Sequence, residues 1–265
     1  MGFYLIKDIF KYKFFIINSI KTEFKTRYAR SKVGLFWAIL HPLAQVLIYA
    51  VILSSVLSNK LPGINNKYSY AIYLMSGMLC WSLFNEIFAR SVNVFVDNAN
   101  IIKKMPFPKI VLILNVIISS LVNNFLLFIS IVFVFSFLGH FLGFTLLILP
   151  FFVLLTIILA SSFGLIFGIL NVFLRDIWQF ISIALQFLFW LTPIVYMIKI
   201  IPQKIEIILY LNPLLHIVNG YHDILVYNKL PNILPLLYPL GLSVFGIFLA
   251  YNLYIRANKD MADIL

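Results

Sequence analysis

The sequence is poor in charged residues. Only 11% of its 265 residues are Asp, Glu, Lys or Arg, and nine of them are acidic, whereas about 25% of the residues of an ordinary globular domain are charged. Apolar and aromatic residues make up 63% of the chain. This balance excludes an ordinary soluble domain and predicts an all-α integral membrane protein.

Cysteine is also scarce. The single cysteine, Cys80, lies in an apolar stretch. The chain therefore has no intrachain disulfide, and its cysteine usage does not reveal the redox compartment. We interpret Cys80 as a small buried apolar residue.

Several site-forming motifs are missing. The sequence contains no GxxxxGK[ST] phosphate-binding loop, no HExxH motif and no cysteine or histidine cluster with metal-ligand spacing. We therefore expect no nucleotide site, metal or other cofactor in this chain. The net charge of +11 could suggest nucleic acid, but the basic residues adjoin apolar stretches. That arrangement favours the membrane surface and a cytoplasmic partner, and not nucleic acid.

Six apolar segments are long enough to cross a membrane, which takes about 20 residues of helix. They are residues 33–57, 70–93, 110–138, 144–174, 177–198 and 233–254. Residues 199–231, between the last two segments, are apolar but are cut by Pro202, Pro213 and Pro231. Because the pieces between these prolines are too short to span, we expect a pair of short re-entrant or interfacial helices there.

Lysine and arginine are unevenly distributed between the two sides that these spans imply. Fifteen lie in the first 32 residues, in residues 90–109, at Arg175 and after residue 254, and five lie in the loops of the other side. Since cytoplasmic loops carry the excess of positive charge, both termini are expected in the cytoplasm. Residues 199–231 then lie on the outer side.

Residues 1–32 have the pattern of an amphipathic helix that lies in the cytoplasmic membrane interface. Apolar residues recur at spacings of three and four from Phe3 to Tyr28, and lysines line one border of that face. Lysine stems can lie along lipid while their ammonium groups reach phosphate. The rest of the chain, residues 33–265, is the predicted transmembrane domain.

Two of the predicted spans carry a stripe of polar and aromatic residues. The stripes are Trp37, His41, Gln45 and Tyr49 in the first span, and Gln179, Ser182, Gln186 and Trp190 in the fifth. Because polar groups are costly against lipid, we expect both stripes to face other helices or an aqueous path. Aromatic rings and amides suit a sugar chain, whereas hydrogen bonds between helices and interfacial aromatic belts are the alternative interpretation.

Other polar residues in the apolar segments have simpler interpretations. Glu86 and Arg90 are one helical turn apart and are expected to neutralise each other, although an ionisable residue in a span is also a candidate for transport chemistry. Two pairs fit contacts between helices, namely Asn123 with Asn124 and Gly164 with Gly168.

The outer segment contains four residues that could form an acid–base site. They are Glu206, His216, His222 and Asp223. Their spacing matches no known motif, which favours a solvated or headgroup-facing surface over a catalytic centre.

Residues 97–108, between the second and third predicted spans, favour a short cytoplasmic helix. Asp97 or Asn98 can cap its start, Lys103 and Lys104 place positive charge at its end, and two prolines then stop it. A short rigid helix of this kind is suited to couple the membrane domain to the movement of a soluble motor protein.

Five stretches together resemble the membrane subunit of ABC type-2 polysaccharide exporters, the permeases that move lipid-linked O-antigen, capsule or teichoic acid. In chain order they are "RYARSKVGLFWAILHPL", "NANIIKKMPFPKI", "NVFLRDIWQF", "FWLTPIVY" and "LNPL". The resemblance covers nearly the whole chain.

The resemblance implies a homodimer of six-span subunits in the bacterial inner membrane. It also implies a separate nucleotide-binding subunit, present in two copies, which binds ATP and magnesium and hydrolyses the ATP. The substrate would be an undecaprenyl-linked polysaccharide, with O-antigen ahead of teichoic acid and capsule. This chain would then be a transport permease and not an enzyme.

The resemblance further implies roles for individual segments. Spans one and five would line the substrate channel, the amino-terminal helix and residues 97–108 would dock the ATPase, and residues 199–231 would form an outer gate. The channel residues would be Trp37, His41, Gln45, Tyr49, Gln179, Ser182, Gln186, Trp190 and Tyr196; the basic residues of the entrance Arg27, Arg30 and Lys32; and the coupling residues Asp97, Asn98, Asn100, Lys103 and Lys104.

Two other functions are compatible with the sequence. One is an integral membrane enzyme that acts on polyprenyl-linked sugars, and the other is an ABC type-2 exporter of drugs or small lipids. An enzyme should lose about 100-fold or more in rate when its acid–base residues are replaced, whereas a gate should lose much less.

Overall fold

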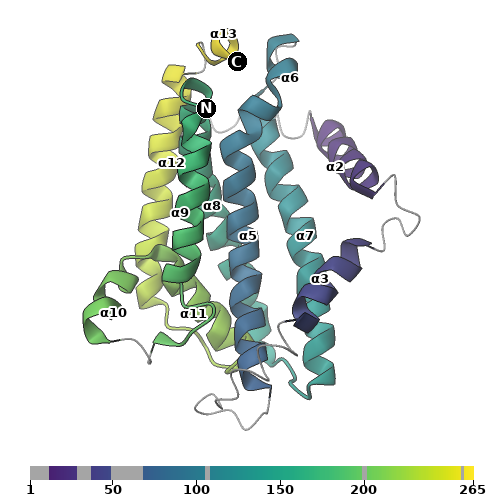
Figure 1. Cartoon of the computed structure of the whole chain (residues 1–265), viewed down its shortest axis with the longest axis vertical. Helices are drawn as coiled ribbons and strands as arrows, with labels where there is room; N and C mark the ends of the chain where they lie inside the picture. Colours follow the sequence, from purple (N-terminus) through teal and green to yellow (C-terminus); the bar gives the residue numbers. More distant parts are fainter. Residues whose placement is uncertain (1–11, 29–36, 49–67, 105–107, 199–201, 258–259) are drawn as a thin grey trace.

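The computed structural model describes residues 12–28, 37–48, 68–104, 108–198, 202–257 and 260–265. Within these ranges the protein is helical and contains no strand. The long helices run side by side as a bundle, with α5 (Ser69–Asp97) in its middle (Figure 1). Because α5 is surrounded by other helices, most of its side chains are buried, including polar ones such as Ser76 and Ser91.

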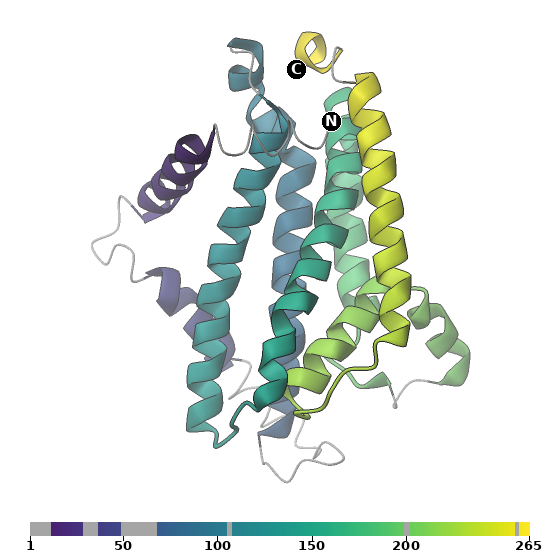
Figure 2. The same cartoon turned by 180° about the vertical axis from the view of Figure 1, so that it is seen from behind.

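The helices that pack against α5 are α7 (Ile110–Phe137), α8 (Leu149–Phe173), α9 (Asp176–Leu191) and α11 (Pro213–Leu225). A further long helix, α12 (Leu237–Ala257), packs on α8. In the view from behind, α8 and α12 lie in front of α5 (Figure 2). The short helices η3 (Phe144–Ile148) and η5 (Leu234–Leu236) lead directly into α8 and α12.

Glycines set the contact between α5 and α8. A Cβ added at Gly164 would lie 2.6 Å from the Cβ of Ser91, and one added at Gly168 would lie 2.5 Å from the carbonyl oxygen of Ser91. Two helices can approach this closely only where one of them has no side chain. The predicted contact through Gly164 and Gly168 is therefore confirmed.

Among the described residues, four helices are long and apolar enough to cross a membrane. They are Ser69–Asp97, Ile110–Phe137, Phe144–Phe173 and Leu234–Ala257. These helices coincide with the second, third, fourth and sixth predicted spans. The prediction of four long apolar helices at these places is confirmed.

The fifth predicted span ends earlier than expected. We predicted it over residues 177–198, but α9 ends at Leu191 and is 16 residues long. Thr192 adopts an extended conformation (φ −99°, ψ 132°), because the ring of the following Pro193 disfavours the helical conformation in the residue before it. The predicted boundary was wrong for this reason.

The described part of the first predicted span, residues 33–57, is α3 (Trp37–Ile48), a helix of 12 residues. It packs along α7, and the rest of that span lies outside the described residues. The count of six spans therefore stays a prediction.

The outer segment contains the two short helices that its prolines predict. They are α10 (Gln203–Tyr210) and α11 (Pro213–Leu225), and both lie at the end of the bundle opposite α6 and α13 (Figure 1). Pro213 occupies the first turn of α11, where its missing N–H costs nothing. The side chain of Asn212 caps this helix by accepting a hydrogen bond from the backbone N–H of Leu214 at 3.0 Å.

At the opposite end of the bundle, α6 (Ala99–Lys104) is the short helix predicted within residues 97–108. Ile102 of α6 shares a small apolar cluster with Met261 of α13 (Met261–Ile264). The side-chain amide of Asn98 donates backward to the carbonyl of Val94 at 2.8 Å, and a side-chain cap of α6 by Asp97 or Asn98 stays a prediction. Residues 105–107 lie outside the described residues.

The described part of the predicted interface helix is α2 (Lys13–Tyr28). It packs on α7 through one side, on which Ile16 is buried and Ser19 accepts a hydrogen bond from Asn115 at 3.0 Å. Phe14 and Ile17 are exposed. Residues 1–11 lie outside the described residues, and the position of this helix in a membrane interface stays a prediction.

Candidate functional site

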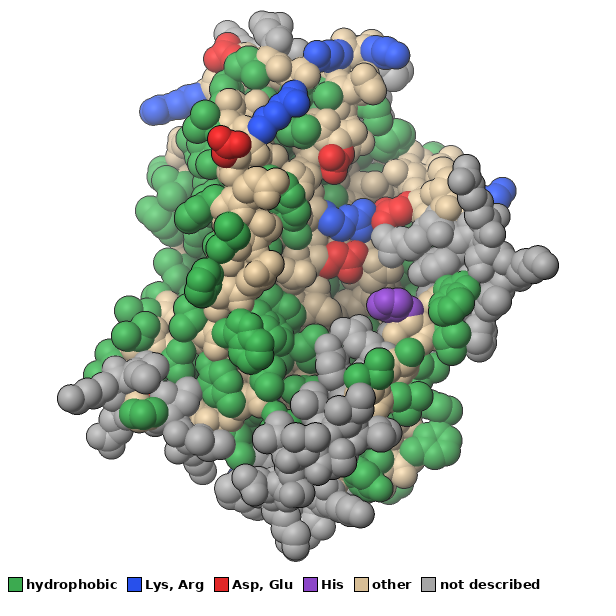
Figure 3. Space-filling model, in the orientation of Figure 1, with side chains coloured by type: hydrophobic (Ala, Val, Ile, Leu, Met, Phe, Trp, Pro, Cys, Tyr) green, Lys and Arg blue, Asp and Glu red, His purple; other side chains and the backbone are tan. Residues whose placement is uncertain are grey.

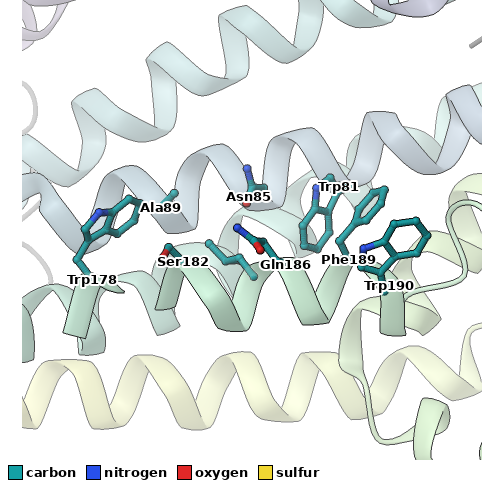
Figure 4. Close-up of a pocket in the computed structure, with 9 residues that line it drawn as sticks. Trp81, Asn85, Ala89, Trp178, Ser182, Gln186, Phe189 and Trp190 are labelled. Carbon is teal, nitrogen blue, oxygen red and sulfur yellow. The ribbon is translucent and has the colours of Figure 1, made fainter. Parts of the chain in front are cut away.

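A groove with a volume of about 590 Å³ runs between α5 and α9. We call it the inner groove. It is lined by Trp81, Asn85 and Ala89 of α5 and by Trp178, Ser182, Leu185, Gln186, Phe189 and Trp190 of α9 (Figure 4). Figure 4 shows the labelled side chains of the two helices facing each other across it.

The spacing of these residues explains why they meet. Residues four apart lie on one face of a helix, and both helices contribute residues at that interval, such as Trp81 with Asn85 and Ser182 with Gln186. Because Trp178 and Trp190 are separated by 12 residues, the lining of α9 extends over about 18 Å.

Aromatic rings are concentrated at one end of the inner groove. Trp81 meets the ring of Phe189 edge-on at a centroid distance of 5.3 Å, and Phe189 meets Trp190 at 5.4 Å. Trp81 is 8% exposed and forms part of the wall, whereas Trp190 is 63% exposed. The indole of Trp190 is therefore available to a ligand.

The chemistry of the lining is polar but uncharged. The amides of Asn85 and Gln186 and the hydroxyl of Ser182 lie among aromatic rings, and none of the residues that line the inner groove carries a charge. Such a surface suits a neutral ligand that has hydroxyl groups at its edges and apolar faces. A pyranose has both.

Three of the four residues of the predicted α9 stripe line the inner groove, namely Ser182, Gln186 and Trp190. Gln179 is exposed and does not line it. Tyr196 lies beside it, since its hydroxyl donates to the carbonyl of Trp190 at 2.7 Å. A role of these residues in transport stays a prediction.

Sequence reasoning missed the half of the inner groove that α5 supplies, together with Trp178 of α9. A usable signal existed, because Tyr73, Gly77, Trp81, Asn85 and Ala89 follow each other at intervals of four. The helix is apolar on its other sides as well, so this face did not stand out.

The predicted stripe of the first span does not join the inner groove within one chain. Trp37 is 42% exposed and His41 is exposed, but α3 packs on α7, across α5 from α9 (Figure 1). Five predicted residues lie outside the described part of the chain, either entirely or in their side chains: Arg27, Arg30, Lys32, Gln45 and Tyr49.

The predicted coupling residues lie at the α6 end of the bundle. Asn100, Lys103 and Lys104 are exposed on α6, and Asp97 is exposed at the end of α5. Asn98, between the two helices, is half-buried. Because Ile102 anchors α6 on α13, its polar side chains are presented outward on a fixed helix.

A charged cluster connects α2, α5 and α7. Arg90 donates to Glu86 on its own helix at 3.2 Å, as predicted, and also to Glu23 of α2 at 3.0 Å. Ser119 of α7 donates to Glu23 at 2.8 Å, and Asn123 of α7 donates to Glu86 at 2.6 Å. Figure 3 shows acidic and basic side chains gathered in the middle of an otherwise largely apolar face.

In this cluster the guanidinium of Arg90 bridges two carboxylates, those of Glu23 and Glu86. Arg90, Glu23 and Glu86 are 29%, 23% and 27% exposed at their side chains, so they are partly shielded from solvent. Sequence reasoning found Glu86 and Arg90 but missed Glu23, because it is 67 residues away from Arg90. The cluster fastens the amino-terminal helix to the bundle.

The four acid–base candidates of the outer segment do not form one site. Glu206 accepts a hydrogen bond from the hydroxyl of Tyr210 at 3.3 Å. Nε2 of His216 lies 3.1 Å from the backbone carbonyl oxygen of Tyr210. His222 and Asp223 line a separate pocket.

The known proteins that match this chain are named for transport or export. The family model described as ABC-2 type transporter matches residues 16–226. The chain is 31% identical over 216 residues to the O-antigen export system permease protein RfbA of Klebsiella pneumoniae, covering 78% of each chain. It is 24% identical to the protein of the same name from Myxococcus xanthus, covering 98% of each chain. It is 26% identical to the polysialic acid transport protein KpsM of Escherichia coli, covering 90% of this chain and 92% of that protein.

Proposed function

The chain belongs to the ABC-2 type transporter family, and we propose that it is the membrane permease of an ATP-driven exporter of a lipid-linked polysaccharide. The observation that carries the proposal is the inner groove, whose uncharged lining alternates aromatic rings with amides and a hydroxyl. The similar proteins named for O-antigen export and for polysialic acid transport support a polysaccharide as substrate. O-antigen is the first candidate, and capsule or teichoic acid is the alternative.

The proposed assembly is a homodimer of six-span subunits in the bacterial inner membrane, with both termini in the cytoplasm. The excess of Lys and Arg on the side of the termini supports this orientation. Since the sequence has no phosphate-binding loop, ATP and magnesium would be bound by two copies of a separate nucleotide-binding subunit. The exposed residues of α6, together with α2, would form its docking surface.

The inner groove would let a sugar chain move along it. Rings such as Trp190 pack on the apolar faces of successive sugars without fixing one position, and amides such as Gln186 exchange hydrogen bonds with hydroxyls as the chain advances. Because the lining carries no charge, no part of the sugar chain would be bound so strongly that it stops moving. At the cytoplasmic entrance, Arg27, Arg30 and Lys32 would meet the phosphate of the lipid carrier.

An export assay tests the proposal. Replacement of Trp190 by alanine should slow polysaccharide export by about three- to tenfold, because an aromatic contact is worth about 0.5–1.5 kcal/mol, and Trp37→Ala should also slow it. Phe248→Ala is the matched control, since Phe248 is 62% exposed on α12 and does not line the inner groove. If both tryptophan variants export normally at normal protein levels, these tryptophans only pack between helices and do not bind the substrate.

A further inference from the structure

A second polar pocket lies at the outer end of the bundle. We call it the outer pocket; its volume is about 260 Å³. It is lined by Tyr73 of α5, by Met197 and Ile198 of the turn after α9, and by Asn219, His222, Asp223 and Tyr227 of α11 and its end. The proposed function so far assigns it no role.

The outer pocket continues the face of α5 that lines the inner groove. Tyr73 precedes Trp81 by eight residues, so the two rings are about 12 Å apart along the helix axis on nearly the same face. Gly77 lies between them, and a Cβ there would be 3.0 Å from Nε2 of His222 and 3.2 Å from Cγ2 of Ile194. The side chains of His222 and Ile194 thus form the wall between the inner groove and the outer pocket.

His222 is a fixed part of this wall. The residue is 3% exposed, and its ring stacks on the ring of Tyr73 at a centroid distance of 3.7 Å. Its Nε2 lies 3.1 Å from the carbonyl oxygen of Tyr73 and must donate, since a carbonyl can only accept. Nδ1 is then an acceptor, and it is buried without a hydrogen-bond partner among the described residues.

The outer pocket contains two acceptor groups, the amide oxygen of Asn219 and the carboxylate of Asp223. Asn219 and Asp223 are one helical turn apart on α11 and both are half-buried. Burial raises the pKa of the Asp223 carboxyl, and the positive charge of Lys229 only partly offsets this. Among the described residues no Lys, Arg or His forms an ion pair with Asp223. A ligand that brings hydroxyl donors would satisfy these acceptors.

We propose that the outer pocket is a second saccharide subsite, in which Asp223 and Asn219 bind the hydroxyls of one sugar unit and Tyr227 packs on its face. This inference rests on the proposed function, because the sugar would belong to the same exported chain after it leaves the inner groove. The wall of His222 and Ile194 would separate successive sugar-binding positions. The subsite would give the outer end of the path its own preference for a sugar.

Sugar binding to the full-length purified protein tests the inference. The probes are methyl α-glucopyranoside, methyl α-mannopyranoside and methyl N-acetylglucosaminide, and binding is followed by saturation-transfer NMR in lipid nanodiscs. Trp190→Ala serves as the background, because it weakens the inner groove and leaves the outer pocket. In this background Asp223→Ala should weaken the remaining sugar binding by about 10-fold or more, since hydrogen bonds to a charged group are worth about 1.5–3 kcal/mol.

Two further variants sharpen the test. Asp223→Asn should weaken sugar binding less than Asp223→Ala, because its amide oxygen still accepts from a hydroxyl. Glu206→Gln is the matched control, since it removes a carboxylate from the same outer segment at a residue that does not line the pocket. Asn219→Ala repeats the test without a change of charge if Asp223→Ala does not fold.

The outcomes separate this inference from the proposed function. Sugar binding that is lost in Trp190→Ala and unchanged in Asp223→Ala overturns the outer subsite and leaves the proposed function standing. The absence of sugar binding in the parent protein counts against both. Calcium binding that is lost equally in Asp223→Asn and Asp223→Ala, with no sugar bound in the Trp190→Ala background, would make the pocket a cation site and overturn the saccharide assignment.

Discussion

Replacement of Arg90 by methionine tests whether the charged cluster holds α2 on the bundle. Arg90 lies 3.0 Å from Glu23 and 3.2 Å from Glu86, so its loss removes the guanidinium that bridges these two neighbouring carboxylates. Removing one partner of a fully buried ion pair costs about 3–5 kcal/mol, whereas an exposed pair is worth about 0–1 kcal/mol. Since these side chains are about a quarter exposed, we expect a loss of about 2 kcal/mol.

The measurement is the thermal unfolding midpoint of the purified protein in detergent, followed by tryptophan fluorescence. A loss of about 2 kcal/mol should lower the midpoint by about 4–8 °C in a chain of this size. Arg256→Met is the control, because Arg256 is exposed in the last turn of α12, and its replacement should change the midpoint by less than about 2 °C.

A second substitution tests whether repulsion between the two carboxylates causes the loss of stability in Arg90→Met. Glu23→Gln in the Arg90→Met background removes one of the two opposed carboxylates, whereas Glu86 keeps its hydrogen bond from Asn123 at 2.6 Å. The double variant should therefore recover at least half of the lost stability. An Arg90→Met protein as stable as the parent, or a double variant less stable than the single one, would refute the reasoning.

The remaining predictions concern the coupling of this chain to its ATPase and the packing between helices. Reversal of charge at Lys103 and Lys104 to glutamate should abolish substrate-stimulated ATP hydrolysis in a correctly assembled complex, because both side chains are exposed on α6; intact stimulation would remove α6 from the docking surface. Gly168→Ala should lower stability by about 1–3 kcal/mol, because its Cβ would lie 2.5 Å from a backbone oxygen of α5. Gly241→Ala, with no atom within 4 Å of its Cβ, should instead gain up to about 1 kcal/mol from helix propensity, and equal effects of the two replacements in thermal unfolding would contradict the close contact.

The long helices were predictable because hydropathy is a local property. Each of α5, α7, α8 and α12 has enough consecutive apolar residues to be recognised without knowledge of its neighbours. The end of α9 was also within reach of local chemistry, since Pro193 forces Thr192 out of the helical conformation. Counting apolar residues alone missed that boundary, because Pro193 is followed by further apolar residues.

The site was only half predictable, for a different reason. Ser182, Gln186 and Trp190 interrupt an apolar segment at helical spacing, and this revealed one wall of the inner groove. The opposite wall on α5 depends on which helix packs against α9, and the residues of α5 at intervals of four do not by themselves identify that partner helix. The pairing of Glu23 with Arg90 joins residues 67 positions apart, and it too follows only from the packing of the bundle.

The close contact between α5 and α8 has a mechanical consequence. A tightly packed pair of helices resists bending and moves as one body, and here the glycines of α8 bring its backbone almost onto that of α5. The wall of the inner groove on α5 is thereby stiffened from behind. Any widening of the passage during a transport cycle would then fall to α9, the opposite wall of the groove.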